Sequence, residues 1–269
     1  MNDEHHEAVR ERIEADKHAD PPPEFIEAVQ AAIAAAIQPY TERMKAGILR
    51  IVMLASTAKA GLDTNDPLNK TTAEDILRAA VVLIHAHLED FLRTIAGVLL
   101  PVGDESFLNS IPLAGLKGRP EKFSLGKLVQ HKGKSVDDVL RESVSEYLDR
   151  RTFNNTEEIT QLLGELGVDT SKVNECFPAI QQMMKRRHQI VHRVDRIRPD
   201  DPTVLEAITP DQVEAWVEAA TKFIASFLGE IAMKLPLAET TSQKLVEELA
   251  VKLPRAETAK GSAITTAKE

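Results

Sequence analysis

The chain has 269 residues and a formal net charge of −9, with 43% hydrophobic and 28% charged residues. This length suits one large domain or one domain with appendages, and the hydrophobic content is enough for a real core. The acidic balance excludes a protein that coats nucleic acid through bulk electrostatics, so any contact with RNA has to be local.

Aromatic residues make up only 4% of the chain, and the abundance of Ala, Leu, Val and Glu favours helix over sheet. Cys176 is the single cysteine, which excludes an intrachain disulfide, fits a reducing cytoplasm and suits a partly buried packing role. The acidic N-terminus lacks the apolar region of a signal peptide, and no apolar run approaches the roughly 18 residues of a membrane span. We therefore expect a soluble, cytoplasmic protein without membrane contact.

The first part of the chain is predicted to carry two appendages. Residues 1–23 form a charged helix followed by the stiff proline-rich spacer Pro21-Pro22-Pro23. Residues 24–69 form a helical extension. We expect an interruption at Pro39, because proline removes a backbone donor and clashes with the preceding turn. A turn-rich loop from Gly61 to Asn69 ends the extension.

Residues 70–234 are predicted to form the main helical domain. The segment from Thr71 to Glu74 spells a capping box, which opens a helix that Pro101 ends. This helix is apolar around most of its circumference, so we expect it to be central and buried. Its narrow polar strip consists of Arg78, His85, Glu89 and Arg93. Glu89 and Arg93 are four residues apart, so the non-catalytic interpretation is that they form an ion pair with each other.

The middle of this domain is predicted to contain two shorter helices. Residues 101–134 are rich in glycine and proline and are expected to be mostly irregular. Ser135 with Asp138 then opens one helix, and Thr156 starts another that Gly164 or Gly167 ends.

A further helix contains Pro178 in its first turn, and Pro199 stops it and begins a linker. Its apolar residues fall on the single arc expected of a core-facing helix, namely Ile180, Met183, Met184, Ile190, Val191 and Val194. At about 100° per residue, Arg187 lies in the middle of that arc, where an always-charged guanidinium needs an anionic partner or a function. His192 lies about 140° farther round the axis, just past the edge of the arc.

The last helix of the domain is predicted to begin at the capping signature of Thr209, Pro210 and Gln212. Its apolar stripe comprises Val213, Trp216, Val217, Ala220, Phe223, Ile224, Phe227, Leu228 and Ile231. Residues 235–269 form a low-complexity segment, which we expect to be a flexible and partly disordered tail. No strand-like alternation extends beyond a few residues, so the predicted fold is all-α, a bundle of about five to seven helices.

The segment from Arg187 to His192 resembles a known motif. Its Arg, four intervening residues and His match the R-x(4–6)-H signature of HEPN-domain proteins, and its Ile-Val-His ending is similar to the RiboL-PSP-HEPN-like branch. The acidic helix from Leu77 to Arg93 resembles the first core helix of that branch, and the resemblance covers residues 70–232. His188 departs from the Asn that follows the Arg in many members, which affects the fine geometry of the site.

This resemblance implies a helical bundle of HEPN type and a metal-independent endoribonuclease that cleaves single-stranded RNA without a cofactor. It also implies a homodimer in which two motifs share one cleft, and a bacterial defence or toxin context with a possible antitoxin partner. His192 would then be the catalytic general acid or base, and Arg187 would clamp the phosphate. His188 would be a secondary polar contact, and Glu89 or Asp90 would support Arg187.

Basic residues around the motif favour local contact with RNA. Within residues 185–198 the only acidic residue is Asp195. A local basic patch on an acidic protein favours a specific contact with an anionic partner. Basic residues at a helix C-terminus also complement the helix dipole, which is the structural alternative. The residues that we expect to bind RNA are Lys185, Arg186, Arg193 and Arg196.

Two alternatives compete with the nuclease interpretation. His188 and His192 share a helix face and could bind a metal, but no third ligand lies close in the sequence, so we expect no metal site. A non-catalytic helical dimer that binds RNA, a nucleotide or a protein partner is the alternative function.

Overall fold

The structure is a computed structural model that describes residues 23–103, 105–115, 125–198 and 201–234. The predictions for residues 1–22 and for the tail, residues 235–269, lie outside these ranges. The α-helices are α2 (Pro23–Leu62), α3 (Pro67–Leu99), α4 (Glu105–Leu108), α5 (Val136–Asp149), α6 (Thr156–Glu165), α7 (Phe177–Arg193) and α8 (Pro210–Lys234). Short 3-10 turns lie at Leu100–Val102, Leu125–His131, Thr170–Lys172 and Asn174–Cys176. The predicted all-α class is confirmed, and the described residues include one small hairpin, β1 (Arg196–Arg198) and β2 (Asp201–Leu205).

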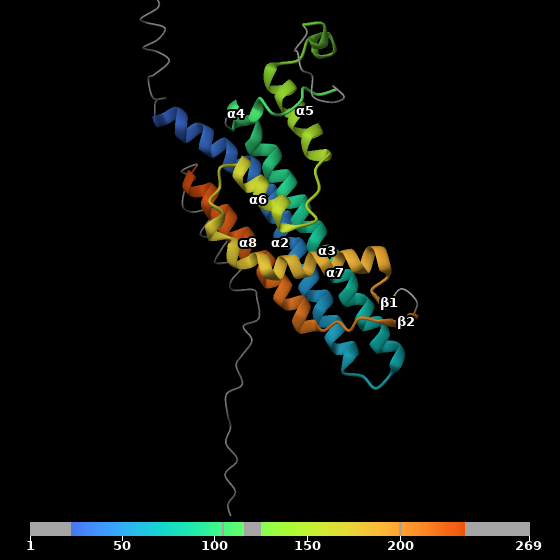
Figure 1. Cartoon of the computed structure of the whole chain (residues 1–269). Coiled ribbons are helices and arrows are strands. Elements are labelled where there is room, and N and C mark those ends of the chain that lie inside the picture. The colour runs from blue at the N-terminus through green and yellow to red at the C-terminus, as the bar shows by residue number, and fades with distance from the viewer. Residues whose placement is uncertain (1–22, 104, 116–124, 199–200, 235–269) are drawn as a thin grey trace, which may run out of the picture.

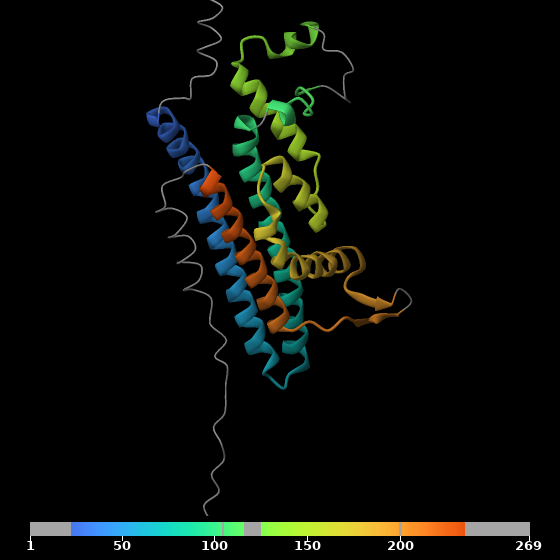
Figure 2. The ribbon, with the colours of Figure 1, turned by 60° about the vertical axis from the view of Figure 1, so that its left-hand side comes forward.

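Three long helices build the bundle. The helices α2, α3 and α8 lie side by side along most of their lengths, and α7 crosses α3 on the opposite side from α2 (Figures 1 and 2). The helices α5 and α6 lie nearer the C-terminal end of α3. This arrangement makes α3 the central helix, as its nearly continuous apolar circumference predicts.

The core of the bundle forms where the apolar stripes of these helices meet. Every residue of the stripe predicted for α8 is buried, so that prediction is confirmed. Phe227 packs edge-on against Phe91 of α3, with ring centroids 6.1 Å apart, and lies parallel to Phe223 at the same spacing. Such aromatic packing adds to the free energy that apolar burial contributes.

Helix α2 runs unbroken through Pro39, so the predicted interruption is wrong. Pro39 is exposed, and the carbonyl that it leaves unpaired, that of Ala35, belongs to an exposed residue that water can reach. On the opposite face, Ile37, Met44 and Ile48 are buried in the same core as α3 and α8. Burial of that face on both sides of Pro39 keeps the helix continuous.

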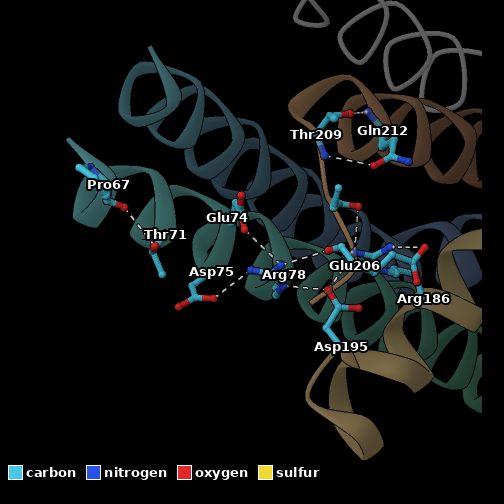
Figure 3. Close-up of polar contacts among 11 residues, drawn as sticks. Pro67, Thr71, Glu74, Asp75, Arg78, Arg186, Asp195, Glu206, Thr209 and Gln212 are labelled. Atoms are coloured by element: carbon cyan, nitrogen blue, oxygen red, sulfur yellow. Dashed lines mark hydrogen bonds and ion pairs between the residues drawn. The ribbon is translucent and has the colours of Figure 1, made fainter. Parts of the chain in front are cut away.

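Helix α3 begins earlier than the capping box predicted. Asp66 is its N-cap, because the Asp66 carboxylate accepts a hydrogen bond from the Leu68 N–H at 3.0 Å, and Pro67 occupies the first turn. Thr71 lies inside the helix and its hydroxyl donates to the Pro67 carbonyl at 3.1 Å (Figure 3). The start predicted at Thr71 is therefore wrong, because the Asp-Pro pair provides an earlier cap.

The other predicted helix ends agree with the structure in most details. Ser135 and Asp138 form the predicted capping box, and Thr209 and Gln212 exchange hydrogen bonds at the start of α8 (Figure 3). Helix α6 begins at Thr156, as predicted, and Asn155 is its N-cap. Gly167 follows α6 at φ +65°, and the Val168 N–H donates to the Leu163 carbonyl at 2.8 Å, which is a Schellman ending.

The polar strip of α3 contacts the segment that follows α5. His85 Nε2 lies 3.0 Å from the Phe153 carbonyl. Arg93 donates to the carbonyls of Leu148 and Arg151 and pairs with Glu89 at 2.8 Å, which confirms the predicted Glu89–Arg93 ion pair. The carbonyls at the end of α5 therefore receive charged donors instead of remaining unpaired.

Candidate active site at the end of α7

Helix α7 ends in a sharp inward turn. Val194 and Asp195 have φ values of 52° and 58°, in the left-handed region, and the N–H groups of both donate to the Gln189 carbonyl. Few side chains adopt this conformation without compensation, and valine least of all. The turn carries the Asp195 side chain back under the helix, where it is fully buried.

The buried Asp195 carboxylate is held by two arginines from different helices. Asp195 Oδ2 accepts a hydrogen bond from Arg78 Nε of α3 and another from Arg186 Nη2 of α7, each at 2.8 Å (Figure 3). We name Arg78, Arg186 and Asp195 the Asp195 cluster. Burial alone would lower the pKa of Arg78, but its hydrogen bond and charge interaction with Asp195 raise that pKa above its ordinary value.

The Asp195 cluster also fixes the chain that follows the hairpin. Both arginines donate to the Glu206 carbonyl, Arg78 at 3.1 Å and Arg186 at 2.8 Å, and Arg186 pairs with the Glu206 carboxylate at 2.7 Å. The Glu206 N–H in turn donates to the Asp195 carbonyl at 2.9 Å. The cluster therefore ties α3, α7 and both ends of the hairpin together.

Arg186 is the buried arginine of α7, whereas the sequence placed Arg187 in the middle of the buried arc. Arg186 is 7% exposed and its guanidinium is engaged in the Asp195 cluster, so this structure leaves it no surface with which to contact RNA. The prediction that Arg186 contributes to an exposed basic patch therefore needs correction. The physical reason is that Asp195, together with the carbonyl of Glu206, draws Arg186 inward.

The predicted arc of α7 is right at its beginning and wrong at its end. Met183 and Met184 are buried, as is Ile180. Val191 and Val194 are 46% and 63% exposed, because α7 passes beyond the edge of the bundle after crossing α3. The last turn of α7 thus presents exposed aliphatic side chains.

Arg187 of α7 is half-buried. Its Nε is buried and has no hydrogen-bond partner among the described residues, and none of them forms an ion pair with its guanidinium. Its positive charge nevertheless acts on the buried His85 of α3. Desolvation is the main cause, and the charge of Arg187 the second, of a His85 pKa below the ordinary value. Arg187 is therefore a cation without a counterion in the described structure.

His188 and His192 lie together on the exposed side of α7. Both side chains are exposed, and their ring centroids are 4.5 Å apart. His192 is therefore exposed in the last turn of α7, while Arg187, five residues earlier, is half-buried. Within one chain no hydrogen bond between described residues joins Arg187 to His192.

The two acidic residues predicted to support Arg187 have other partners. Glu89 pairs with Arg93, and its second oxygen lies 3.8 Å from His85 Nδ1. Asp90 pairs with Arg43 of α2 at 2.7 Å. Asp90 therefore belongs to the contact between α2 and α3, whereas Glu89 lies on the side of α3 that carries His85.

The segment predicted as a linker after α7 is a short antiparallel hairpin. Arg196 pairs with Leu205 and Arg198 with Asp201, and the hairpin stands out from the bundle beside the end of α7 (Figure 2). All three residues of β1 are exposed. The exposed cations of α7 and β1 are Lys185, Arg193, Arg196 and Arg198.

Sequence reasoning missed both the Asp195 cluster and the hairpin. The available signals were Arg78 in the polar strip of α3 and the single acid, Asp195, among the basic residues that follow Met184. Neither signal indicates that Arg78 and Asp195 are in contact, because they are 117 positions apart in the sequence.

Comparisons with known proteins give one result. A family model described as RiboL-PSP-HEPN matches residues 52–232, and thus extends from α2 through most of α8. No curated protein and no solved structure matches the chain. In the described part of the chain, no helix is long and apolar enough to cross a membrane, and no group of three or more His, Cys, Asp and Glu side chains could hold a metal ion.

Proposed function

The chain belongs to the RiboL-PSP-HEPN family, and from that premise we propose that it is a metal-independent endoribonuclease acting on single-stranded RNA. The observation that carries the proposal is the pair Arg187 and His192 at one end of α7. Among the described residues Arg187 is a guanidinium without a counterion, and His192 is an exposed imidazole beside basic residues. These are the two kinds of group that phosphodiester cleavage requires.

RNA supplies its own nucleophile, the 2′-hydroxyl next to the scissile phosphate. A base removes the 2′ proton, the 2′ oxygen attacks phosphorus, and the bond to the 5′ oxygen breaks as an acid protonates that oxygen. The products are a 2′,3′-cyclic phosphate and a 5′-hydroxyl end. Imidazole suits both proton transfers because its ordinary pKa lies near neutral pH. A guanidinium suits the phosphorane charge because its fork matches two phosphate oxygens.

The imidazole of His192 alone does not supply both an acid and a base in a single step. We therefore propose a homodimer in which His192 of two copies stands on either side of one phosphate, with Arg187 of one or both copies as the clamp. The exposed Val191 and Val194 support this, since they give the last turn of α7 an apolar surface that a second copy would cover.

The exposed cations beside the motif complete the proposed RNA surface. Lys185, Arg193 and Arg196 are all exposed and suited to phosphate contacts, and His188, whose ring centroid lies 4.5 Å from that of His192, is a secondary polar contact. Arg186 is not part of this proposed RNA surface, because its guanidinium is paired with the Asp195 carboxylate. A cytoplasmic defence or toxin role, restrained by an antitoxin, is the biological context that fits such an activity.

The test is cleavage of a labelled single-stranded RNA in excess EDTA, with the ends of the products identified. We expect cleavage to persist in EDTA, to leave 2′,3′-cyclic phosphate ends, and to stop when every 2′-hydroxyl of the strand is replaced by a 2′-methoxy group. Loss of cleavage in EDTA with recovery on adding Mg²⁺ would contradict the mechanism. So would cleavage of the 2′-methoxy strand, because it has no nucleophile to deprotonate.

One observation favours the alternative function, a non-catalytic dimer that binds RNA, a nucleotide or a protein partner. Within one chain Arg187 is half-buried and its charge lowers the pKa of His85 on α3, whereas His192 is exposed. If a second copy does not unite them, the same basic end of α7 can bind an anionic ligand but not transfer protons. RNA binding without cleavage by the wild-type protein would favour this alternative.

A further inference from the structure

The motif lies on a part of α7 that has little packing of its own. None of the residues from Arg187 to Val194, all of which the structure describes, is buried, and Ile190 packs only partly against the core. The last turn of a helix lacks part of its backbone hydrogen bonds and opens most easily. Without further contacts, Arg187 and His192 would therefore not keep a fixed separation.

The two residues that flank this segment are buried and bind each other. Arg186 directly precedes Arg187 and is 7% exposed. Asp195 follows His192 by three positions and is fully buried. Arg186 Nη2 donates to Asp195 Oδ2 at 2.8 Å (Figure 3). A single buried ion pair therefore holds both ends of the segment that carries the motif.

Arg78 connects this segment to the central helix. Arg186 and Asp195 both belong to the end of α7, so their pair alone would not fix that end against the bundle. Arg78 of α3 donates to Asp195 Oδ2 at 2.8 Å and to the Glu206 carbonyl at 3.1 Å. The Gln189 amide in turn donates to the Glu206 carboxylate at 2.6 Å. Through Arg78, the end of α7 is therefore held on α3.

The turn after the motif is one that only strong contacts maintain. Val194 and Asp195 both adopt left-handed φ values, of 52° and 58°. This region suits glycine and is unfavourable for a β-branched residue such as valine. Backbone strain of this kind persists where the surrounding contacts enforce it, and it is concentrated at functional sites. The Asp195 cluster supplies those contacts.

We infer that Arg78, Arg186 and Asp195 are positioning residues of the proposed active site, an inference that rests on the proposed function. The cluster holds Arg187 and His192 at a fixed separation and orientation before RNA binds, which lowers the entropy cost of reaching the transition state. Apolar residues of similar volume often stabilise a fold as well as a buried ion pair does. The ion pair differs from them in that its charges and hydrogen bonds require one arrangement.

Arg78→Met tests the connection to α3, because methionine fills much of the same volume but has no donor for Asp195. The pair of Arg186 with Asp195 remains, so the protein should fold. Arg78→Lys is the conservative variant, since its amine can still donate to Asp195. Glu165→Ala is the matched control. It breaks another largely buried ion pair, with Arg151, at side-chain exposures of 9% and 12%, on α6 and nearer the other end of α3.

We expect Arg78→Met to lower kcat on the order of 100-fold with little change in KM, because a small misplacement of catalytic groups slows the chemical step more than it weakens binding. Arg78→Lys should recover most of that loss. Glu165→Ala should keep the wild-type kcat at a temperature at which all variants are folded. A wild-type kcat in Arg78→Met, or an equal loss in Glu165→Ala, would overturn the inference.

A second measurement needs neither cleavage nor a variant. The N–H groups of Val194 and Asp195 donate to the Gln189 carbonyl. In the wild-type protein without RNA, we expect their hydrogen exchange to be as slow as that of Met183 and Met184 in the buried part of α7. Exchange as fast as in an unfolded chain would overturn the inference. Slow exchange in a protein that cleaves no RNA would reject the proposed function and leave the anchoring of α7 in place.

Discussion

His192→Ala is expected to lower the rate of RNA cleavage by about 100-fold to 10,000-fold, the usual contribution of a general acid or base. The imidazole of His192 is the only group of the last turn of α7 suited to proton transfer near neutral pH, apart from its neighbour His188. The measurement is the single-turnover rate with saturating labelled RNA, which separates the chemical step from binding.

Two controls make this result specific. Because His192 is exposed, its replacement should leave the free energy of unfolding within about 0.5 kcal/mol of the wild-type value. His188→Ala, at the neighbouring ring, should cost less activity than His192→Ala. A His192→Ala protein that cleaves at the wild-type rate, or a larger loss in His188→Ala, would contradict the assigned roles.

Asp195→Ala is expected to reduce the free energy of unfolding by about 3–5 kcal/mol, the range for removing one partner of a buried ion pair. The substitution would leave the guanidiniums of Arg78 and Arg186, 7% exposed each, without their shared carboxylate. It would also release the left-handed turn that joins α7 to the hairpin. Chemical denaturation monitored by circular dichroism measures the change.

Asp90→Ala is the matched control for this prediction. Asp90 also pairs with an arginine, Arg43, but both side chains are about half exposed, at 53% and 50%. Exposed pairs contribute between about 0 and 1 kcal/mol. Equal losses in the two variants would contradict the view that burial makes the Asp195 cluster important.

The sequence predicts the bundle well because helical periodicity depends on local spacing. The stripe of α8, from Val213 to Ile231, is buried at each predicted position, and the central place of α3 follows from its apolar circumference. The errors at Pro39 and Thr71 also have local causes. A single exposed proline costs one hydrogen bond, which packing on both sides outweighs, and the Asp66-Pro67 pair caps α3 before Thr71 does.

The candidate site is less predictable because its geometry depends on contacts between distant residues. Helical spacing placed Arg187 inward, but Asp195 and Arg78 determine that Arg186 is the buried arginine. The three residues of β1 are too few for alternation to reveal a strand. Glu89 and Asp90 are adjacent in sequence, yet their different partners, Arg93 and Arg43, lie on different helices.

The central claim is that two copies of the chain each contribute a His192 to one reaction. Its most direct test adds His192→Ala protein to a fixed amount of wild-type protein, after conditions that let subunits exchange. Since random pairing places half of the wild-type chains in mixed dimers, an equal amount of variant should reduce cleavage to about half, and a larger excess should reduce it further. Cleavage that stays constant at every ratio would mean that one chain carries a complete site, which would contradict the account.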